Sequence, residues 1–258
     1  MPDATRRRTL QVFIDSALSF ALIVAGVSVI YLAWSKSRAS TVPPPTTPLS
    51  LIGAHLKGNI DAPVAIMVFS DFSCPYCRIF ATEILPKIER QYIDTGQVLL
   101  AFRHYPIAAI HPLAVDAADI AECAGDQGAF WQMHDALFSQ PRPSRRSDLF
   151  MIGRRIGVNI SLLRECLSTS ARTRIGADIS IGREIGVHST PVFLIGTLAN
   201  RHLIATHVIG GAQPFNTFTE AIDDALGEHQ SVLDRYARYI IGILRCTLVL
   251  STVPAQSI

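Results

Sequence analysis

The chain has 258 residues, of which 49% are hydrophobic and 17% are charged, and its formal net charge at pH 7 is +2. This length can bury a full hydrophobic core. The nearly balanced charge, without a basic cluster among aromatic residues, argues against nucleic-acid binding. So small a share of charged residues indicates that an apolar segment raises the average.

The apolar segment is residues 16–35, which contain no charged side chain. A helix of this length crosses the hydrocarbon core of a bilayer, so we expect a transmembrane anchor. The N-terminus, residues 1–15, carries arginines at positions 6–8 and is expected in the cytoplasm, although Lys36 and Arg38 weaken the charge asymmetry. The rest of the chain would then face the periplasm or the cell exterior.

A cleavable signal peptide is the alternative, because residues 37–39 loosely resemble a cleavage site. The apolar stretch is longer than a usual signal core, which favours a retained anchor. Both interpretations export the domain to a compartment where disulfides persist. Residues 36–50 are rich in proline, and we expect them to form a semi-rigid spacer between the membrane and a domain at residues 51–228.

Two cysteines lie where a buried strand is expected to pass into a helix. Residues 64–69 are continuously apolar, which predicts a strand buried on both faces. Apolar residues recur at helical spacing from residue 80 to residue 92, and Gly96 ends the pattern. We expect a kink at Pro86, with the helix continuing beyond it. The sequence Cys74-Pro75-Tyr76-Cys77 occupies the junction.

This junction suits thiol chemistry. The first turn of a helix has unpaired N–H groups and the positive end of the helix dipole, which stabilise a thiolate on Cys74. Pro75 suits the first helical position, where no N–H is needed. Cys77 lies three residues on, on the same face of the turn, and can close a disulfide with Cys74. The pattern therefore predicts a nucleophile and its resolving partner, with no other cofactor.

Two structural roles compete with this interpretation. A zinc site needs four ligands, and no second close Cys or His pair follows at finger-like spacing, so we expect no metal. A structural disulfide closing so short a loop would constrain the unfolded chain very little. Redox chemistry is the stronger hypothesis.

The remaining segments predict a sheet interrupted by helices. A second strand at 98–102 implies a right-handed parallel crossover from the first. A helical block at about 107–186 follows, and the sheet resumes with strands near 192–196 and 203–209 and a last helix from 215 to 226. Pro191 heads the first of these strands and is a candidate cis peptide. The helices expected in the block cover residues 111–125, 128–138, 149–156, 161–167 and 172–185.

Taken together, these features resemble the thioredoxin superfamily, and most closely its DsbA-like branch of exported disulfide oxidoreductases. Residues 71–77 (Asp-Phe-Ser-Cys-Pro-Tyr-Cys) and residues 123–131 (Cys-Ala-Gly-Asp-Gln-Gly-Ala-Phe-Trp) carry the resemblance, which covers about residues 51–227. It implies an α/β fold, thioredoxin-like, with an inserted helical subdomain.

The resemblance also implies roles for single residues. Pro191 would be cis beside the disulfide, and Thr190 would offer its backbone to a docked substrate. The DsbA-like oxidant has a histidine where this chain has Tyr76, which suggests a less depressed Cys74 pKa and a milder oxidant. A quinone-linked membrane reoxidase would restore the disulfide. The spacer is too short for the dimerisation domain of exported isomerases, which favours a monomer.

Other polar residues have two interpretations each. Asp71 would shuttle a proton during exchange, but an ordinary surface turn aspartate is the simpler expectation. Cys123 and Cys166 would form a structural disulfide or remain buried thiols. The scattered histidines are better explained as satisfied or surface residues than as ligands. The tail, residues 229–258 with Cys246, is expected to form an amphipathic helix.

We therefore expect a membrane-tethered thiol–disulfide oxidoreductase that forms disulfides in exported proteins. A disulfide isomerase or reductase would use the same residues with the opposite redox poise. A tethered module that holds a metal or a peptide is the alternative without catalysis.

Overall fold

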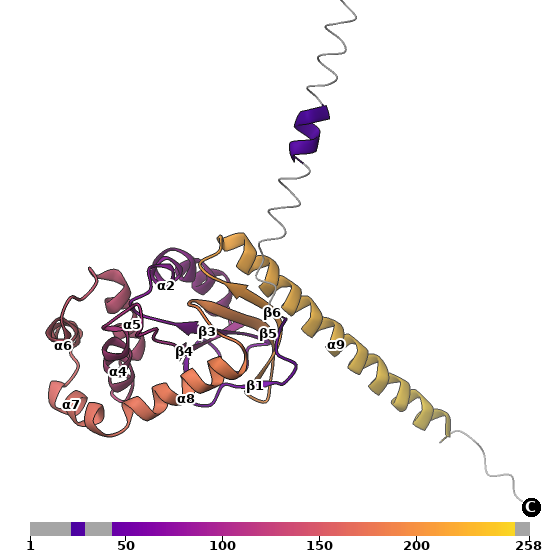
Figure 1. Ribbon diagram of the computed structural model, residues 1–258. Helices are drawn as coiled ribbons and strands as arrows, with labels where there is room; N and C mark the ends of the chain where they lie inside the picture. The colour runs from indigo at the N-terminus through magenta and orange to yellow at the C-terminus, as the bar shows by residue number, and fades with distance from the viewer. Residues whose placement is uncertain (1–21, 29–42, 251–258) are drawn as a thin grey trace, which may run out of the picture. The chain divides into compact units, whose positions relative to one another are not determined.

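The computed structural model describes residues 22–28 and 43–250 (Figure 1). The chain divides into two compact units, Met1–Thr41 and Val42–Ile258. In the first unit, residues 22–28 are helical, and the rest of the anchor predicted at 16–35 lies outside the described residues. Among the described residues, no helix is both long enough and apolar enough to cross a membrane.

The second unit is built on a six-stranded sheet in the order β1-β6-β5-β3-β4-β2. β3 and β4 are parallel, which confirms the predicted direction of the second strand, whereas β5 runs antiparallel to both β3 and β6. The strands are β1 (Leu49–Ser50), β2 (His55–Lys57), β3 (Val64–Ser70), β4 (Val98–His104), β5 (Val192–Ala199) and β6 (His202–Gly210).

β3 is the central strand, and all seven of its residues are buried. Its side chains alternate between the two faces of the sheet, as the pleat requires. The even-numbered residues from 64 to 68 join one apolar cluster, and the odd-numbered residues from 65 to 69 join the other. Helices therefore cover both faces, as the continuous apolar run predicted.

After β3 and a short turn, the chain is helical from Pro75 to Ile93 without a break. This stretch consists of α2 (Pro75–Ile79), the π-helical segment η1 (Phe80–Ile84), α3 (Leu85–Ile88) and a second π-helical segment, η2 (Glu89–Ile93). The helix continues past Pro86, as predicted, and the wide turn of η1 comes directly before it, with the Leu85 N–H bonded to the Phe80 carbonyl. Since proline has no N–H to donate, a wider turn at this point accommodates it.

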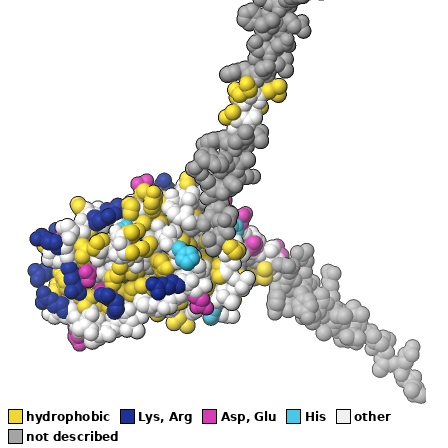
Figure 2. Space-filling view, viewed as in Figure 1, with side chains coloured by type: hydrophobic (Ala, Val, Ile, Leu, Met, Phe, Trp, Pro, Cys, Tyr) yellow, Lys and Arg dark blue, Asp and Glu magenta, His cyan; other side chains and the backbone are white. Residues whose placement is uncertain are grey.

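The inserted block has five helices, which begin and end within three residues of the predicted bounds. On the face shown in Figure 2, Lys and Arg side chains gather over the α6 and α7 end of this block. A disulfide between Cys123 and Cys166 joins α4 to α7, which decides between the two possibilities left open by the sequence. The helices are α4 (Ala114–Gly125), α5 (Phe130–Ser139), α6 (Arg146–Arg155), α7 (Ile160–Thr169) and α8 (Ala171–Glu184).

Two ends of the domain differ from the prediction. β1 takes Leu49 and Ser50 from the predicted spacer, because Leu49 is buried and pairs with Leu203. At the other end, α9 (Phe215–Leu250) is a single helix, so the predicted tail helix is the continuation of the last helix of the domain. No proline interrupts the chain between Pro214 and Pro254, and nothing in that run ends the helix at residue 228.

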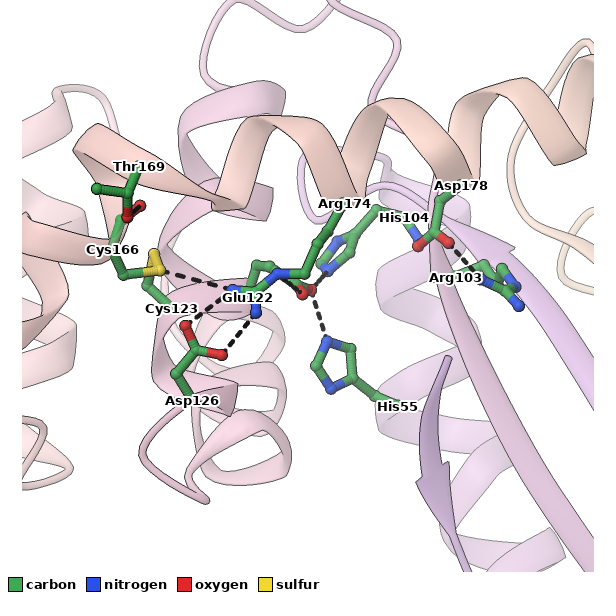
Figure 3. A network of polar contacts seen from close by, with 10 residues as sticks. All are labelled: His55, Arg103, His104, Glu122, Cys123, Asp126, Cys166, Thr169, Arg174 and Asp178. Carbon is green, nitrogen blue, oxygen red and sulfur yellow. Dashed lines mark hydrogen bonds and ion pairs between the residues drawn. A yellow bond between two sulfur atoms is a disulfide. The ribbon is translucent and has the colours of Figure 1, made fainter. Parts of the chain in front are cut away.

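Arg103 on β4 contacts both the start of the domain and α8 of the inserted block. Its side chain is 2% exposed, and its Nη1 lies 2.6 Å from Oδ1 of Asp178 on α8 (Figure 3). Its Nη2 donates to the carbonyl oxygens of Ser50 at 2.9 Å and Ile52 at 2.7 Å. These three acceptors compensate the two terminal nitrogens for their loss of water, whereas the buried Nε has no hydrogen-bond partner among the described residues.

Candidate active site

Cys74 occupies the N-cap of α2. Its backbone is extended, with φ −79° and ψ 127°, and Pro75 takes the first helical position, as the sequence predicted. Cys74 is 6% exposed and Cys77 is 1% exposed, and both are free thiols. The junction therefore holds one sulfur at the edge of the surface and the other beneath it.

The surroundings shift the pKa values of the two thiols in opposite directions. A hydrogen bond from the Cys77 side chain, helped by backbone N–H groups of the first turn and opposed by burial, lowers the pKa of Cys74 to about 5. Burial, together with the hydrogen bond and the charge of Cys74, raises the pKa of Cys77 well above its usual range. At neutral pH Cys74 is a thiolate and Cys77 is a thiol. These are the protonation states of a nucleophile and a resolving partner.

The Thr190–Pro191 segment lies against this pair, although it is more than a hundred residues away in the chain. Its peptide bond is cis, as both the strand pattern and the resemblance predicted. Cys74 Sγ lies 3.3 Å from the Thr190 carbonyl oxygen, to which it can donate a hydrogen bond only when the sulfur is protonated. Pro191 is buried directly before β5, so the sheet fixes the distance between this segment and Cys74.

Asp71 is not the surface residue that we expected. Its side chain is buried, with Oδ1 accepting from the Ser73 N–H at 2.7 Å. Its Oδ2 accepts from the Ile107 N–H at 2.9 Å and lies 2.7 Å from His111 Nδ1. The Asp71 N–H is directed at Cys77 Sγ at 3.4 Å. The carboxylate therefore clamps the turn before Cys74 to the loop before α4.

Tyr76 lies in the first turn of α2, two residues after Cys74, and is 59% exposed. A pocket of about 180 Å³ opens next to Ser73. His111 and the exposed Ile110 contribute to its wall, and Arg142 gives it a positive charge. His111 was not predicted as a partner of Asp71, because no sequence pattern links two residues that are forty positions apart.

A second polar cluster lies between the sheet and the inserted block (Figure 3). Glu122 Oε2 is 2.6 Å from His55 Nε2 and 3.0 Å from His104 Nε2. Burial alone would raise the pKa of Glu122, but the hydrogen bonds from His104 and His55 outweigh it and hold the pKa well below its usual range. This cluster was not predicted from the sequence, because His55 lies on an unpredicted three-residue strand and the three residues are far apart in the chain.

The fold and the cysteine pair define the second unit as a domain of the thiol–disulfide oxidoreductase class. Comparison with known families gives the same result, because residues 50–224 match the family model described as thioredoxin. The chain belongs to the thioredoxin family.

The chain is also similar to individual proteins, of which one is a solved structure and two are known sequences. The crystal structure of alpha-DsbA1 from Wolbachia pipientis superposes with a TM-score of 0.63 at 25% identity, covering 72% of this chain and 96% of that one. The probable disulfide bond formation protein D of Bacillus anthracis is 35% identical over 85 residues, which are 33% of this chain and 39% of that protein. The Na(+)/H(+) antiporter NhaA 1 of Salinispora arenicola is 31% identical over 192 residues, which are 67% of this chain but only 29% of the antiporter.

Proposed function

We propose that Cys74 and Cys77 form a redox-active pair that introduces disulfides into exported proteins. One observation carries the proposal: the Cys74 pKa falls to about 5 while the pKa of its neighbour Cys77 rises. A thiolate that is stable at neutral pH favours the reduced form of the pair, and this preference drives electrons from a client dithiol into the protein.

The cycle would run as follows. A client thiolate attacks Cys74 Sγ of the disulfide, the Cys74–Cys77 bond breaks, and Cys77 leaves and takes up a proton, in keeping with its raised pKa. A second client thiolate then attacks the client sulfur of the mixed disulfide and releases Cys74 as a thiolate. The client gains one disulfide, and the pair gains two electrons.

Thr190 and Tyr76 are the proposed contacts for the client. The Thr190 carbonyl lies 3.3 Å from Cys74 Sγ, where an extended client segment could pair with the backbone. The exposed ring of Tyr76 offers an apolar surface on the same rim. Asp71 would support the turn rather than touch the client, because its carboxylate is buried.

We place the domain outside the cytoplasmic membrane, tethered by residues 16–35. The charge pattern around the segment supports this orientation. The matching region of the antiporter relative is part of a longer membrane protein, which also supports a position beside a membrane. A quinone-linked partner in that membrane would accept the two electrons and restore the disulfide. The protein would act as a monomer.

The reduction potential of the Cys74–Cys77 pair tests whether electrons pass from the client to the pair or in the opposite direction. A Cys74 pKa of about 5 falls between about 7 for thioredoxin and about 3.5 for DsbA. Their potentials are about −270 mV and about −120 mV, so we expect about −180 mV for this pair. The full-length chain in detergent would be equilibrated in glutathione buffers, and its thiols would be counted after alkylation. A potential below about −250 mV would instead assign a reductase.

Client assays separate the remaining alternatives. An oxidase forms disulfides in reduced ribonuclease, whereas an isomerase preferentially reactivates scrambled ribonuclease. We expect Cys74→Ser to abolish client oxidation, with Cys246→Ser as the matched control that retains it. A module that only holds a metal or a peptide would leave the client thiols unchanged.

A further inference from the structure

The cluster of His55, His104 and Glu122 has the composition of a metal site. The three side chains come from β2, the end of β4 and α4, and they converge on one point (Figure 3). One ligand atom from each lies within 4.8 Å of the other two. Both histidines direct Nε2 at the same carboxylate oxygen, at 2.6 Å and 3.0 Å.

The charges around the cluster are not balanced, because the carboxylates outnumber the cationic side chains. Glu122 is buried, and Arg174 Nε lies 2.7 Å from its Oε1. The same guanidinium also makes a bidentate pair with Asp126, at 2.7 Å and 2.8 Å. One positive charge therefore serves two carboxylates. With neutral imidazoles, Glu122, Asp126 and Arg174 together carry one net negative charge, which a bound cation would balance.

We propose that His55 Nε2, His104 Nε2 and Glu122 Oε2 bind a zinc ion, with water in the fourth position. Two imidazoles and one carboxylate form a donor set that zinc accepts, whereas magnesium and calcium prefer oxygen ligands alone. Ligands around tetrahedral zinc lie about 3.3 Å apart, so the contact of Glu122 with His55 must lengthen by about 0.7 Å and the contact with His104 by about 0.3 Å.

The surroundings allow that adjustment and hold the ligands in place. The His55 side chain is 19% exposed on a three-residue edge strand, so this residue can move and gives the ion and water a route inward. Its ring stacks on Phe130 with centroids 3.5 Å apart, which keeps its orientation. Arg174 on the second carboxylate oxygen is the kind of outer contact that orients a ligating carboxylate.

Zinc at this position would join the sheet to the inserted block. It would connect β2 and β4 to α4 without using Cys74 or Cys77. The proposal is therefore independent of the redox function, and the failure of either leaves the other standing. We expect zinc to raise the thermal unfolding temperature, because an ion that binds only the folded chain stabilises it.

The test uses the full-length chain in detergent with the Cys74–Cys77 disulfide formed and the remaining thiol alkylated, so that no thiolate competes for metal. After treatment with a chelator, zinc is titrated by calorimetry and cobalt by its visible absorption. We expect one equivalent to bind with micromolar affinity or tighter. His55→Phe keeps a ring to stack on Phe130 but removes the ligand, and we expect at least tenfold weaker binding. His202→Phe, at an exposed histidine on β6, is the matched control and should bind as the wild type does.

X-ray absorption of the zinc-loaded wild-type chain gives a readout that needs no variant. We expect two imidazoles and oxygen around the ion, and no sulfur. The absence of stoichiometric binding, a sulfur ligand, fewer than two imidazoles, or full affinity in folded His55→Phe would each overturn the proposal. If His55→Phe does not fold, Glu122→Gln serves in its place, since it keeps the shape of the side chain and removes its charge.

Discussion

Replacing Cys77 tests the origin of the Cys74 thiolate most directly. The hydrogen bond from Cys77 is the largest cause of the low Cys74 pKa. A hydrogen bond to a charged group contributes about 1.5–3 kcal/mol, and a tenfold change in an ionisation constant is about 1.36 kcal/mol. We therefore expect Cys77→Ala to raise the Cys74 pKa from about 5 to between about 6 and 7. Cys77→Ser keeps a donor and should leave it near its original value.

The measurement is the rate of alkylation of Cys74 by iodoacetamide as a function of pH, in a Cys246→Ser background. The reactive thiolate is present above its pKa, so the rate in the reduced parent should be flat above about pH 6 and fall tenfold for each pH unit below 5. Equal titration of the alanine and serine variants would refute the role of the hydrogen bond. A midpoint near 9 in the parent would refute the stabilised thiolate itself.

Four further predictions concern stability. The reduced protein should gain about 2.3 kcal/mol of stability relative to the oxidised protein between pH 5 and pH 7. The stabilisation from a lowered pKa is complete above the unfolded value of 9.0 and is lost as pH falls through about 5. Urea unfolding of both forms at the two pH values measures this difference. Asp71→Asn should cost about 2–3 kcal/mol, since its amide cannot accept all the hydrogen bonds that the carboxylate accepts, whereas the exposed Asp61→Asn should cost almost nothing in the same urea assay. Replacing both Cys123 and Cys166 by alanine should cost about 4 kcal/mol, because their disulfide spans 43 residues, and an unchanged denaturation midpoint would contradict this. Gly196→Ala should cost at least about 2 kcal/mol, because its Cβ would lie 2.0 Å from the Ile204 carbonyl oxygen at a β-bulge, while Gly176→Ala in α8 meets no atom within 4 Å and should stabilise the protein slightly in thermal unfolding.

Local patterns predicted the parts of the fold that depend on neighbouring residues. The apolar run at 64–69 identified β3 because a strand covered on both faces has no polar positions. The junction at Cys74 was recognisable because a proline suits the first helical position. The bounds of the inserted helices followed from helical spacing in the same way.

Features that depend on distant segments were not predictable from the sequence. β2 has only three residues, too few for any periodicity, so its pairing with β4 and the place of His55 remained hidden. Asp71 is buried because the loop before α4 covers it, and only the folded chain brings that loop to the turn. The expectation of a surface aspartate was wrong for this reason.

The small exposure of Cys74 has a consequence for the timing of oxidation. Only 6% of Cys74 is exposed, so a flexible peptide can approach its sulfur more easily than a cysteine held within a packed domain. On the proposed oxidation of client proteins, unfolded chains should therefore be oxidised faster than folded proteins whose thiols are held rigidly.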